Sequence, residues 1–121
     1  MTIGCDLVHV PSFAAQLAIP GTTMWSWFTP TERAQSRGPE SLAARWAAKE
    51  AFIKAWSAQH YAQEPVMTEQ QVRWAEIEVV CDTFGRPRLF LHGAIEEISG
   101  ISHAEISLSH EEDYAIAVCT L

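Results

Sequence analysis

A chain of 121 residues with 48% hydrophobic content is long enough for one hydrophobic core and too short for two, so we expect one domain over residues 1–121. No apolar run reaches the eighteen or so residues of a membrane-spanning helix, and the N-terminus lacks the order of a signal peptide, which predicts a cytoplasmic protein with no membrane partner. The three cysteines, Cys5, Cys81 and Cys119, have no CxxC spacing and lie in apolar stretches. This favours buried free thiols over a zinc site or disulfides.

The net charge of −7 argues against a general nucleic-acid binder, but the charge is unevenly distributed. Residues 31–58 carry five basic against three acidic side chains, a net charge of +2, whereas residues 59–121 carry three arginines against eleven acids, a net charge of −8. A basic segment in an acidic chain suits local binding of an anion such as a phosphate group. An ordinary solvated helix would show the same charges. The five basic residues are Arg33, Arg37, Arg45, Lys49 and Lys54.

The first half of the chain predicts a strand followed by helices. Residues 2–10 are β-branched and apolar, which predicts a buried strand, and residues 12–17 suit a short helix before an aromatic stretch at 25–28. A helix begins at Pro30, with Thr29 as its N-cap and Glu32 in the position of a capping box. After the break at residues 38–39, Ser41 is the expected cap of a long helix from Leu42 to about Gln59.

The second half predicts antiparallel hairpins. Strands are expected at residues 77–81 and 88–92 around a turn at 84–87, and at 104–109 and 114–119 around a turn at 110–113. A short helix at residues 93–99 ends at Gly100. Helices followed by hairpins predict an α+β domain.

Two faces of the long helix differ in composition. At about 100° per residue, Leu42, Trp46 and Ile53 fall on one stripe, which we expect to face the core. Glu50 and Lys54 lie about 40° apart on the neighbouring face, whose other members are alanines at 43, 47 and 51. Small residues around two charges predict room for a ligand. The alternative is an exposed ion pair worth ~0.3 to 0.5 kcal/mol.

Asp6 interrupts the first strand, and a carboxylate inside a buried strand needs a compensating partner. Asp6 and Glu50 could jointly hold Mg²⁺, which usually takes one or two protein carboxylates together with water and substrate phosphates. Lys54, one turn beyond Glu50, could then reach the same phosphates as a point charge. His9 follows on the same strand and could be a further ligand or a structural residue.

Two segments resemble motifs of a known family. Residues 3–8 (IGCDLV) resemble the N-terminal G-x-D-[ILV]-V motif of the phosphopantetheinyl transferases, and residues 45–55 (RWAAKEAFIKA) are similar to their W/F-x-x-K-E-A-x-x-K-A motif. Residues 28–33, 85–87, and 107–110 with 114–118 agree with the short, holo-[acyl-carrier-protein] synthase branch, so the resemblance covers nearly the whole chain. Residues 42–57 look most like the actinobacterial members.

The resemblance implies a Mg²⁺-dependent enzyme that transfers the 4′-phosphopantetheine arm of coenzyme A to a serine of an acyl carrier protein or carrier domain. This reaction releases adenosine 3′,5′-bisphosphate and supplies holo carriers for fatty-acid biosynthesis. The implied fold is an antiparallel sheet packed against a long central helix, assembled as a homotrimer with coenzyme A in the cleft between subunits. Trp25, Trp27 and Trp74 would suit such an interface or complete a small core.

The resemblance also implies roles for individual residues. Asp6 and Glu50 are the implied metal ligands, and Lys54 is implied to contact the phosphates and favour the leaving group. The base that deprotonates the serine is Glu50 or a water held in the metal site. The implied coenzyme A contacts are Arg45, Lys49, Lys54, Gly85, Arg86, Pro87 and His110.

Carrier recognition departs from the family pattern. Residues 11–27 contain no lysine or arginine, although resembling proteins place basic residues on the first helix to meet an acidic carrier. Arg33 and Arg37 on the next helix could substitute, or the carrier could dock on apolar side chains at Phe13, Leu17 and residues 25–28. Two other function classes compete with the transferase: a non-catalytic coenzyme A-binding module and a purely structural oligomerising domain. Neither needs Asp6, Glu50 and Lys54 together.

Overall fold

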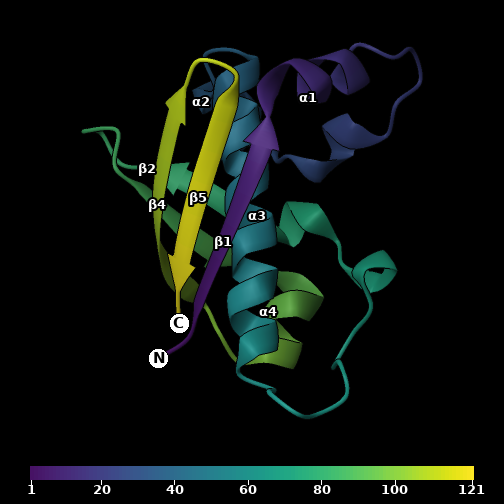
Figure 1. Ribbon diagram of the computed structural model, residues 1–121, viewed down its shortest axis with the longest axis vertical. Coiled ribbons are helices and arrows are strands. Elements are labelled where there is room, and N and C mark those ends of the chain that lie inside the picture. The colour runs from purple at the N-terminus through teal and green to yellow at the C-terminus, as the bar shows by residue number, and fades with distance from the viewer.

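Strand β1 begins the chain and is paired with the last strand, β5, so the two ends of the chain lie together (Figure 1). The computed structural model describes residues 1–121. Three short 3₁₀ helices accompany the strands and α-helices: η1 (Met24–Trp27), η2 (Glu69–Gln71) and η3 (Trp74–Glu76). The other elements are β1 (Ile3–His9), α1 (Val10–Leu17), α2 (Pro30–Gln35), α3 (Pro39–Ala58), β2 (Ile77–Cys81), β3 (Pro87–Leu91), α4 (Gly93–Ser99), β4 (His103–Glu111) and β5 (Tyr114–Thr120).

The five strands form one antiparallel sheet in the order β1-β5-β4-β3-β2, with α3 packed along one face (Figure 1). This confirms the predicted α+β architecture with a long helix against the sheet. Strands β3 and β4 pair only through Leu89 with Ala104 and Phe90 with His103. The pairing ends there, so the rest of β4 is hydrogen-bonded only to β5. The predicted hairpins are confirmed, except that β4 runs on through His110, which the sequence assigns to the turn.

Helix α2 begins as the sequence predicts. The Thr29 side chain accepts from the Glu32 backbone N–H at 3.1 Å, and the Glu32 carboxylate accepts from the Thr29 N–H at 3.0 Å. The predicted cap of α3 was wrong. The N-cap is Gly38, at φ 145°, and Pro39 is the first helical residue, because proline has no N–H to leave unpaired there. Ser41 is therefore inside the helix.

The alanine face of α3 is buried against the sheet, so the predicted room for a ligand on this face is absent. Ala43, Ala47 and Ala51 are fully buried. Gly4 of β1 crosses α3 so closely that a Cβ atom there would stand 1.9 Å from the Ala51 carbonyl oxygen. Small residues on both elements let strand and helix backbones approach. The predicted core stripe holds for Leu42, whereas Trp46 and Ile53 are only half-buried.

Three tryptophans pack on one another within the chain. Trp46 stacks on Trp27 with ring centroids 4.4 Å apart and meets Trp74 edge-on at 4.6 Å. Trp25 stays 43% exposed and donates from its indole N–H to the Leu17 carbonyl. Two of the three tryptophans that could have suited an interface thus belong to an internal cluster.

The sheet face opposite α3 carries no helix (Figure 1). Apolar side chains of β1 and β5 are exposed. Leu7 lies opposite Ile116 in the register, and Ile3 and Tyr114 lie at the two ends of the same strand pair. None of the helices is both long enough and apolar enough to cross a membrane.

Candidate functional site

Asp6 and Glu50 meet where β1 crosses the middle of α3. On β1, alternate residues point toward the helix, which turns Gly4 and Asp6 inward and leaves Cys5 and Leu7 outside. Lys54 joins them from one turn further along α3. Its Nζ donates to Asp6 Oδ1 at 3.0 Å and to the Cys5 carbonyl at 2.9 Å, while its side chain stays 56% exposed. The structure therefore brings together the three residues predicted to carry the chemistry.

The two carboxyl groups perturb each other. Burial, followed by the charge and hydrogen bonding of Asp6, raises the pKa of Glu50 from 4.5 to about 7. Glu69, on η2, adds a further negative charge that raises the pKa of Glu50. Hydrogen bonding to Asp6 raises the pKa of Lys54. The Asp6–Glu50 carboxyl pair is stabilised when it shares a proton or when a cation lies beside it.

The donor set fits a hard divalent cation. Asp6 is only 11% exposed at its side chain, and Glu50 is half-buried, so their mutual repulsion is not fully relieved by water. No group of three or more histidine, cysteine, aspartate or glutamate side chains converges in a metal-binding arrangement. Two carboxylates are the number that Mg²⁺ commonly takes from protein, with water and phosphate oxygens completing its shell.

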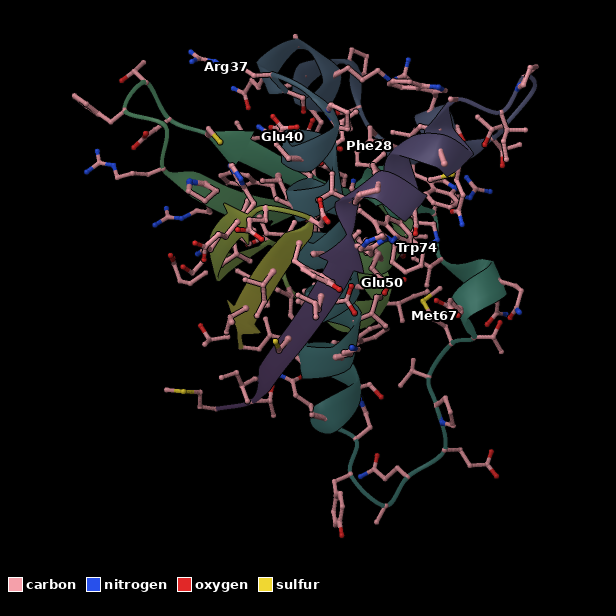
Figure 2. All side chains as sticks on the ribbon, turned by 45° about the horizontal axis from the view of Figure 1, so that its top comes forward. Phe28, Arg37, Glu40, Glu50, Met67 and Trp74 are labelled. Atoms are coloured by element: carbon pink, nitrogen blue, oxygen red, sulfur yellow. The ribbon has the colours of Figure 1, made fainter.

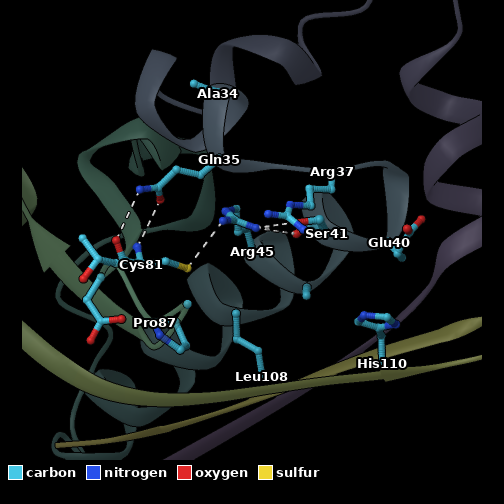
Figure 3. Close-up of a pocket in the computed structure, with 14 residues that line it drawn as sticks. Ala34, Gln35, Arg37, Glu40, Ser41, Arg45, Cys81, Pro87, Leu108 and His110 are labelled. Atoms are coloured by element: carbon cyan, nitrogen blue, oxygen red, sulfur yellow. Dashed lines mark hydrogen bonds between the residues drawn. The ribbon is translucent and has the colours of Figure 1, made fainter.

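A cavity of about 800 Å³ opens between the start of α3, the β2–β3 turn and β4 (Figure 3). It lies beyond the point where β3 and β4 cease to pair, which leaves Leu108 and His110 of β4 facing it. Arg45, Gly85, Pro87 and His110 all line it. Four of the seven predicted coenzyme A contacts therefore share one cavity.

Arg45 is the buried cation of this cavity. Only 5% of it is exposed, and its Nη1 donates to the Ser41 hydroxyl at 2.5 Å. Its Nη2 faces Cys81 Sγ at 3.6 Å, and its Nε has no hydrogen-bond partner (Figure 3). A buried guanidinium with a free N–H and no carboxylate partner suits an anionic ligand.

The β2–β3 turn splits the predicted Gly85-Arg86-Pro87 loop. Gly85, at φ 80°, and Pro87 face the cavity, whereas the Arg86 side chain is 73% exposed and borders a separate surface hollow. Arg86 Nε pairs with Asp82 at 2.7 Å, and its guanidinium lies over the Phe84 ring at 4.9 Å. Arg86 therefore closes the turn and does not line the cavity.

Lys49 lies in the interior of the protein. Its ammonium is completely buried and pairs with Glu32 Oε1 at 2.8 Å. It also donates to the carbonyls of Trp74, at 2.9 Å, and Ile77. Burial lowers the pKa of Lys49, and Glu32 partly offsets this effect. All three donors of the Lys49 ammonium have internal acceptors and Lys49 does not line the cavity, so its contact with coenzyme A stays a prediction from the sequence.

The carboxylate site and the cavity lie on different sides of α3. Arg45 and Glu50 are five residues apart, which separates their directions by about 140° around the helix axis. Figure 2 shows Glu50 on the side of Trp74 and Met67, away from Arg37 and Glu40 at the start of α3. Neither Asp6, Glu50 nor Lys54 lines the cavity.

Several residues near these sites escaped sequence reasoning. Arg37 lines the cavity together with Glu40, Ser41 and Cys81. The basic segment is a signal for Arg37, which the sequence analysis assigns with Arg33 to the helix that begins at Pro30. Helix α2 ends at Gln35, so the two arginines share no helical face.

The two candidate carrier surfaces also change. Arg33 Nη2 donates to the Trp25 carbonyl and borders a hollow with Leu17 and Trp25. Phe13, Leu17 and Phe28 are buried in the core, which removes most of the predicted apolar docking surface. His9 is structural: its Nδ1 caps α1 at Ser12.

Comparison with known proteins identifies the family. The model of the 4′-phosphopantetheinyl transferase superfamily matches residues 2–119. A holo-[acyl-carrier-protein] synthase from Corynebacterium efficiens is 48% identical, with the alignment covering 100% of this chain and 93% of that protein. A second from Mycobacterium tuberculosis is 49% identical over 98% of this chain and 94% of its own length. These relatives agree with the predicted actinobacterial character.

Solved structures agree in fold and sequence. An ACPS–CoA complex from Chronobacterium ammoniagenes superposes with a TM-score of 0.89 at 50% identity, covering 98% of this chain and 93% of that one. The acyl carrier protein synthase of Mycobacterium tuberculosis gives a TM-score of 0.79 at 45% identity over 98% and 93% of the two chains. With matched motifs, matched fold and full-length relatives, the chain belongs to the 4′-phosphopantetheinyl transferase superfamily.

Proposed function

We propose that residues 1–121 form a holo-[acyl-carrier-protein] synthase that transfers the 4′-phosphopantetheine arm of coenzyme A to a serine of an acyl carrier protein or carrier domain. The observation that carries this proposal is the convergence of Asp6, Glu50 and Lys54 at the β1–α3 crossing. It is supported by the holo-[acyl-carrier-protein] synthases that this chain resembles over its full length.

Asp6 and Glu50 would hold Mg²⁺ through one oxygen or more each. When bound, the metal would neutralise charge on the diphosphate of coenzyme A and orient it for attack. Lys54 is placed to offset the charge that develops on the bridging oxygen as the diphosphate breaks, because its ammonium borders the same carboxylates. Asp6 holds that ammonium in place.

The serine hydroxyl must lose its proton as it attacks phosphorus. Burial and the neighbouring Asp6 raise the pKa of Glu50 to about 7 in the cation-free site, and a bound cation would lower this pKa. Glu50, or a water beside it, is the acceptor in this proposal. The serine oxygen forms a bond to the phosphorus that carries the pantetheine arm, and its proton passes to Glu50 or, through the water, to solvent. The bond from that phosphorus to the bridging oxygen breaks, so the bridging oxygen leaves on adenosine 3′,5′-bisphosphate.

The nucleotide end of coenzyme A would occupy the cavity of about 800 Å³. Arg45, whose guanidinium has no carboxylate partner, supplies positive charge beside a phosphate, and His110 and Arg37 add two more basic groups. Gly85 and Pro87 shape the wall opposite α3, where a flat base can approach backbone.

We also propose that the enzyme is a homotrimer. The cavity and the carboxylates face different sides of α3, so one coenzyme A can reach both more readily if the cavity of one subunit adjoins the carboxylates of the next. The exposed apolar side chains of β1 and β5, including Leu7 and Ile116, offer a surface for such contacts. Three unpaired cysteines fit action in the reducing cytoplasm.

Mass spectrometry tests the proposal directly. An apo carrier incubated with the protein, coenzyme A and Mg²⁺ should gain about 340 Da, the mass of the arm, and the gain should require the metal. Binding of coenzyme A without any mass gain on several carriers would instead indicate a non-catalytic binding module. Light scattering in the same buffer measures the oligomeric state.

A further inference from the structure

All three protons of the Lys49 ammonium are already committed inside the protein. A lysine ammonium has three donors, and those of Lys49 go to Glu32 Oε1 at 2.8 Å, to the Trp74 carbonyl at 2.9 Å and to the Ile77 carbonyl. Lys49 and Glu32 are both fully buried. No proton of this ammonium remains for a phosphate, although the residue next to it is Glu50.

Glu32 is equally committed. One of its oxygens accepts from the Thr29 N–H at 3.0 Å as well as from Lys49, and the other accepts from the Val79 N–H at 3.1 Å. The ion pair therefore joins the start of α2, the middle of α3 and strand β2. A further group could bind to this ion pair only if α2, α3 and β2 all moved.

The two carbonyls that Lys49 holds bracket η3, the segment that leads into β2. The ring of Trp74 packs on Trp46 at 4.6 Å, and Trp46 is one turn before Glu50 on α3. The chain just before η3 carries Glu69, which shares the lining of a cavity of about 270 Å³ with Ile53. Lys49 thus fixes the end of a segment whose Trp74 lies on the same side as Glu50 (Figure 2) and whose Glu69 is close enough to raise the pKa of Glu50.

We propose that Lys49 is a positioning residue: it ties residues 74–77 to α3 so that Trp74 and Glu69 lie beside Glu50, and it makes no contact with coenzyme A. The positioning role of Lys49 rests on the proposed transfer reaction. The lack of contact between Lys49 and coenzyme A does not rest on that reaction, and it can be measured without enzymatic turnover.

The chain offers a direct test because Lys49 and Lys54 are its only lysines. Reductive methylation of the native protein with ¹³C-formaldehyde should label Lys54 and the N-terminal amine and leave Lys49 unmodified. Tryptic mapping identifies each site, and denaturation before labelling is the control that must modify both lysines. Added coenzyme A should change labelling at Lys54 only. Methylation of Lys49 in the native protein, with protection by coenzyme A, would overturn the proposal.

A test of the positioning role needs a variant that removes both charges of the Glu32–Lys49 pair together. Glu32→Gln with Lys49→Met deletes both charges, because either change alone would leave a buried charge unpaired. We expect kcat to fall about tenfold to a hundredfold, because Trp74 and Glu69 are displaced from Glu50, and the Kd for adenosine 3′,5′-bisphosphate to stay within about twofold. Near-UV circular dichroism and tryptophan emission should change with it, since Trp74 packs on Trp46.

Arg45→Met is the matched control, a basic residue on the same helix that does line the cavity. It should weaken nucleotide binding and leave the tryptophan signals intact. A double variant with wild-type kcat and wild-type near-UV spectrum would refute the positioning role. If that variant folds poorly, the comparison is made in trimethylamine oxide, which strengthens the folded state. If no variant or wild-type protein transfers the arm, the proposed function fails while the methylation result still decides whether Lys49 is accessible.

Discussion

Gly4 and Ala51 meet with almost no space between them: a Cβ on Gly4 would lie 1.9 Å from the Ala51 carbonyl oxygen and 2.7 Å from the Ala55 nitrogen. Both neighbours are helix backbone, which cannot rotate away as a side chain could. This contact sets the depth at which β1 crosses α3, and Asp6 follows two residues later. The same close approach therefore serves packing and chemistry.

Gly4→Ala should accordingly lower both the stability of the fold and the rate of transfer. We expect a loss of unfolding free energy of about 3 kcal/mol or more, at the upper end of what overpacking costs, because no side chain can yield. Transfer should fall further than the folded fraction does, since Asp6 is displaced from Glu50. Thermal melts and rates per folded molecule measure the two effects. Cys5→Ala, which changes the outward-facing neighbour, is the control and should behave like wild type.

Asp6→Ala and Glu50→Ala should each abolish transfer without unfolding the protein. Removing either carboxylate relieves their mutual repulsion, so thermal melts should stay near those of wild type or rise. Residual activity above about a tenth of the wild-type rate at saturating Mg²⁺ would contradict the assignment of that residue as a metal ligand.

Lys54→Ala should separate binding from chemistry. The ammonium already neutralises part of the carboxylate pair, and its largest effect is expected when charge develops on the leaving oxygen. The rate of transfer should therefore fall more than the affinity for coenzyme A, measured by single-turnover kinetics and calorimetry. Equal losses would make Lys54 an ordinary phosphate anchor.

The raised pKa of Glu50 predicts a pH dependence of stability in metal-free protein. The folded carboxyl holds its proton up to about pH 7, whereas the unfolded one loses it near 4.5. The stabilisation that Glu50 gives by keeping its proton is fully present below pH 4.5, the pKa in the unfolded chain. It is lost as the pH rises to about 7, the pKa in the folded protein, so the free energy of unfolding should fall across this range. Denaturant melts along this range measure it, and Glu50→Gln should flatten the profile. Because the cation needs ionised ligands, Mg²⁺ should raise the melting temperature more at about pH 8 than at about pH 5.5.

Arg33 and Arg37 should behave differently from each other. Arg37→Glu, at the cavity, should weaken coenzyme A binding and leave the carrier KM unchanged. Arg33→Glu should instead raise the carrier KM, and this effect should shrink as salt approaches the range where charges are screened within about 10 Å. An unchanged carrier KM for Arg33→Glu, together with a flat salt profile, would remove Arg33 from carrier recognition.

The sequence was informative where chemistry depends on local spacing. Asp6 was visible as a charge in an apolar strand, and Glu50 and Lys54 as an i,i+4 pair, so their meeting needed only the strand to cross the helix. The fate of Lys49 depended on Glu32, seventeen residues earlier on another helix, and on two backbone carbonyls that no pattern marks. Arg86 likewise pairs within its own turn, which the motif could not reveal. The alanines misled us because small residues serve close packing as well as ligand access.

The pairing of β1 with β5 also bears on how the chain could be rewired. The Thr2 N–H donates to the Leu121 carbonyl at 2.8 Å, and the Leu121 N–H donates back to Thr2 at 3.0 Å. A short linker could therefore join residues 2 and 121 without disturbing the sheet, and new ends opened in the exposed stretch around Tyr61 would leave β1, α3 and Asp6 intact. The same adjacency allows the whole unit to be spliced into an exposed loop of a host protein, entering and leaving at nearly one point.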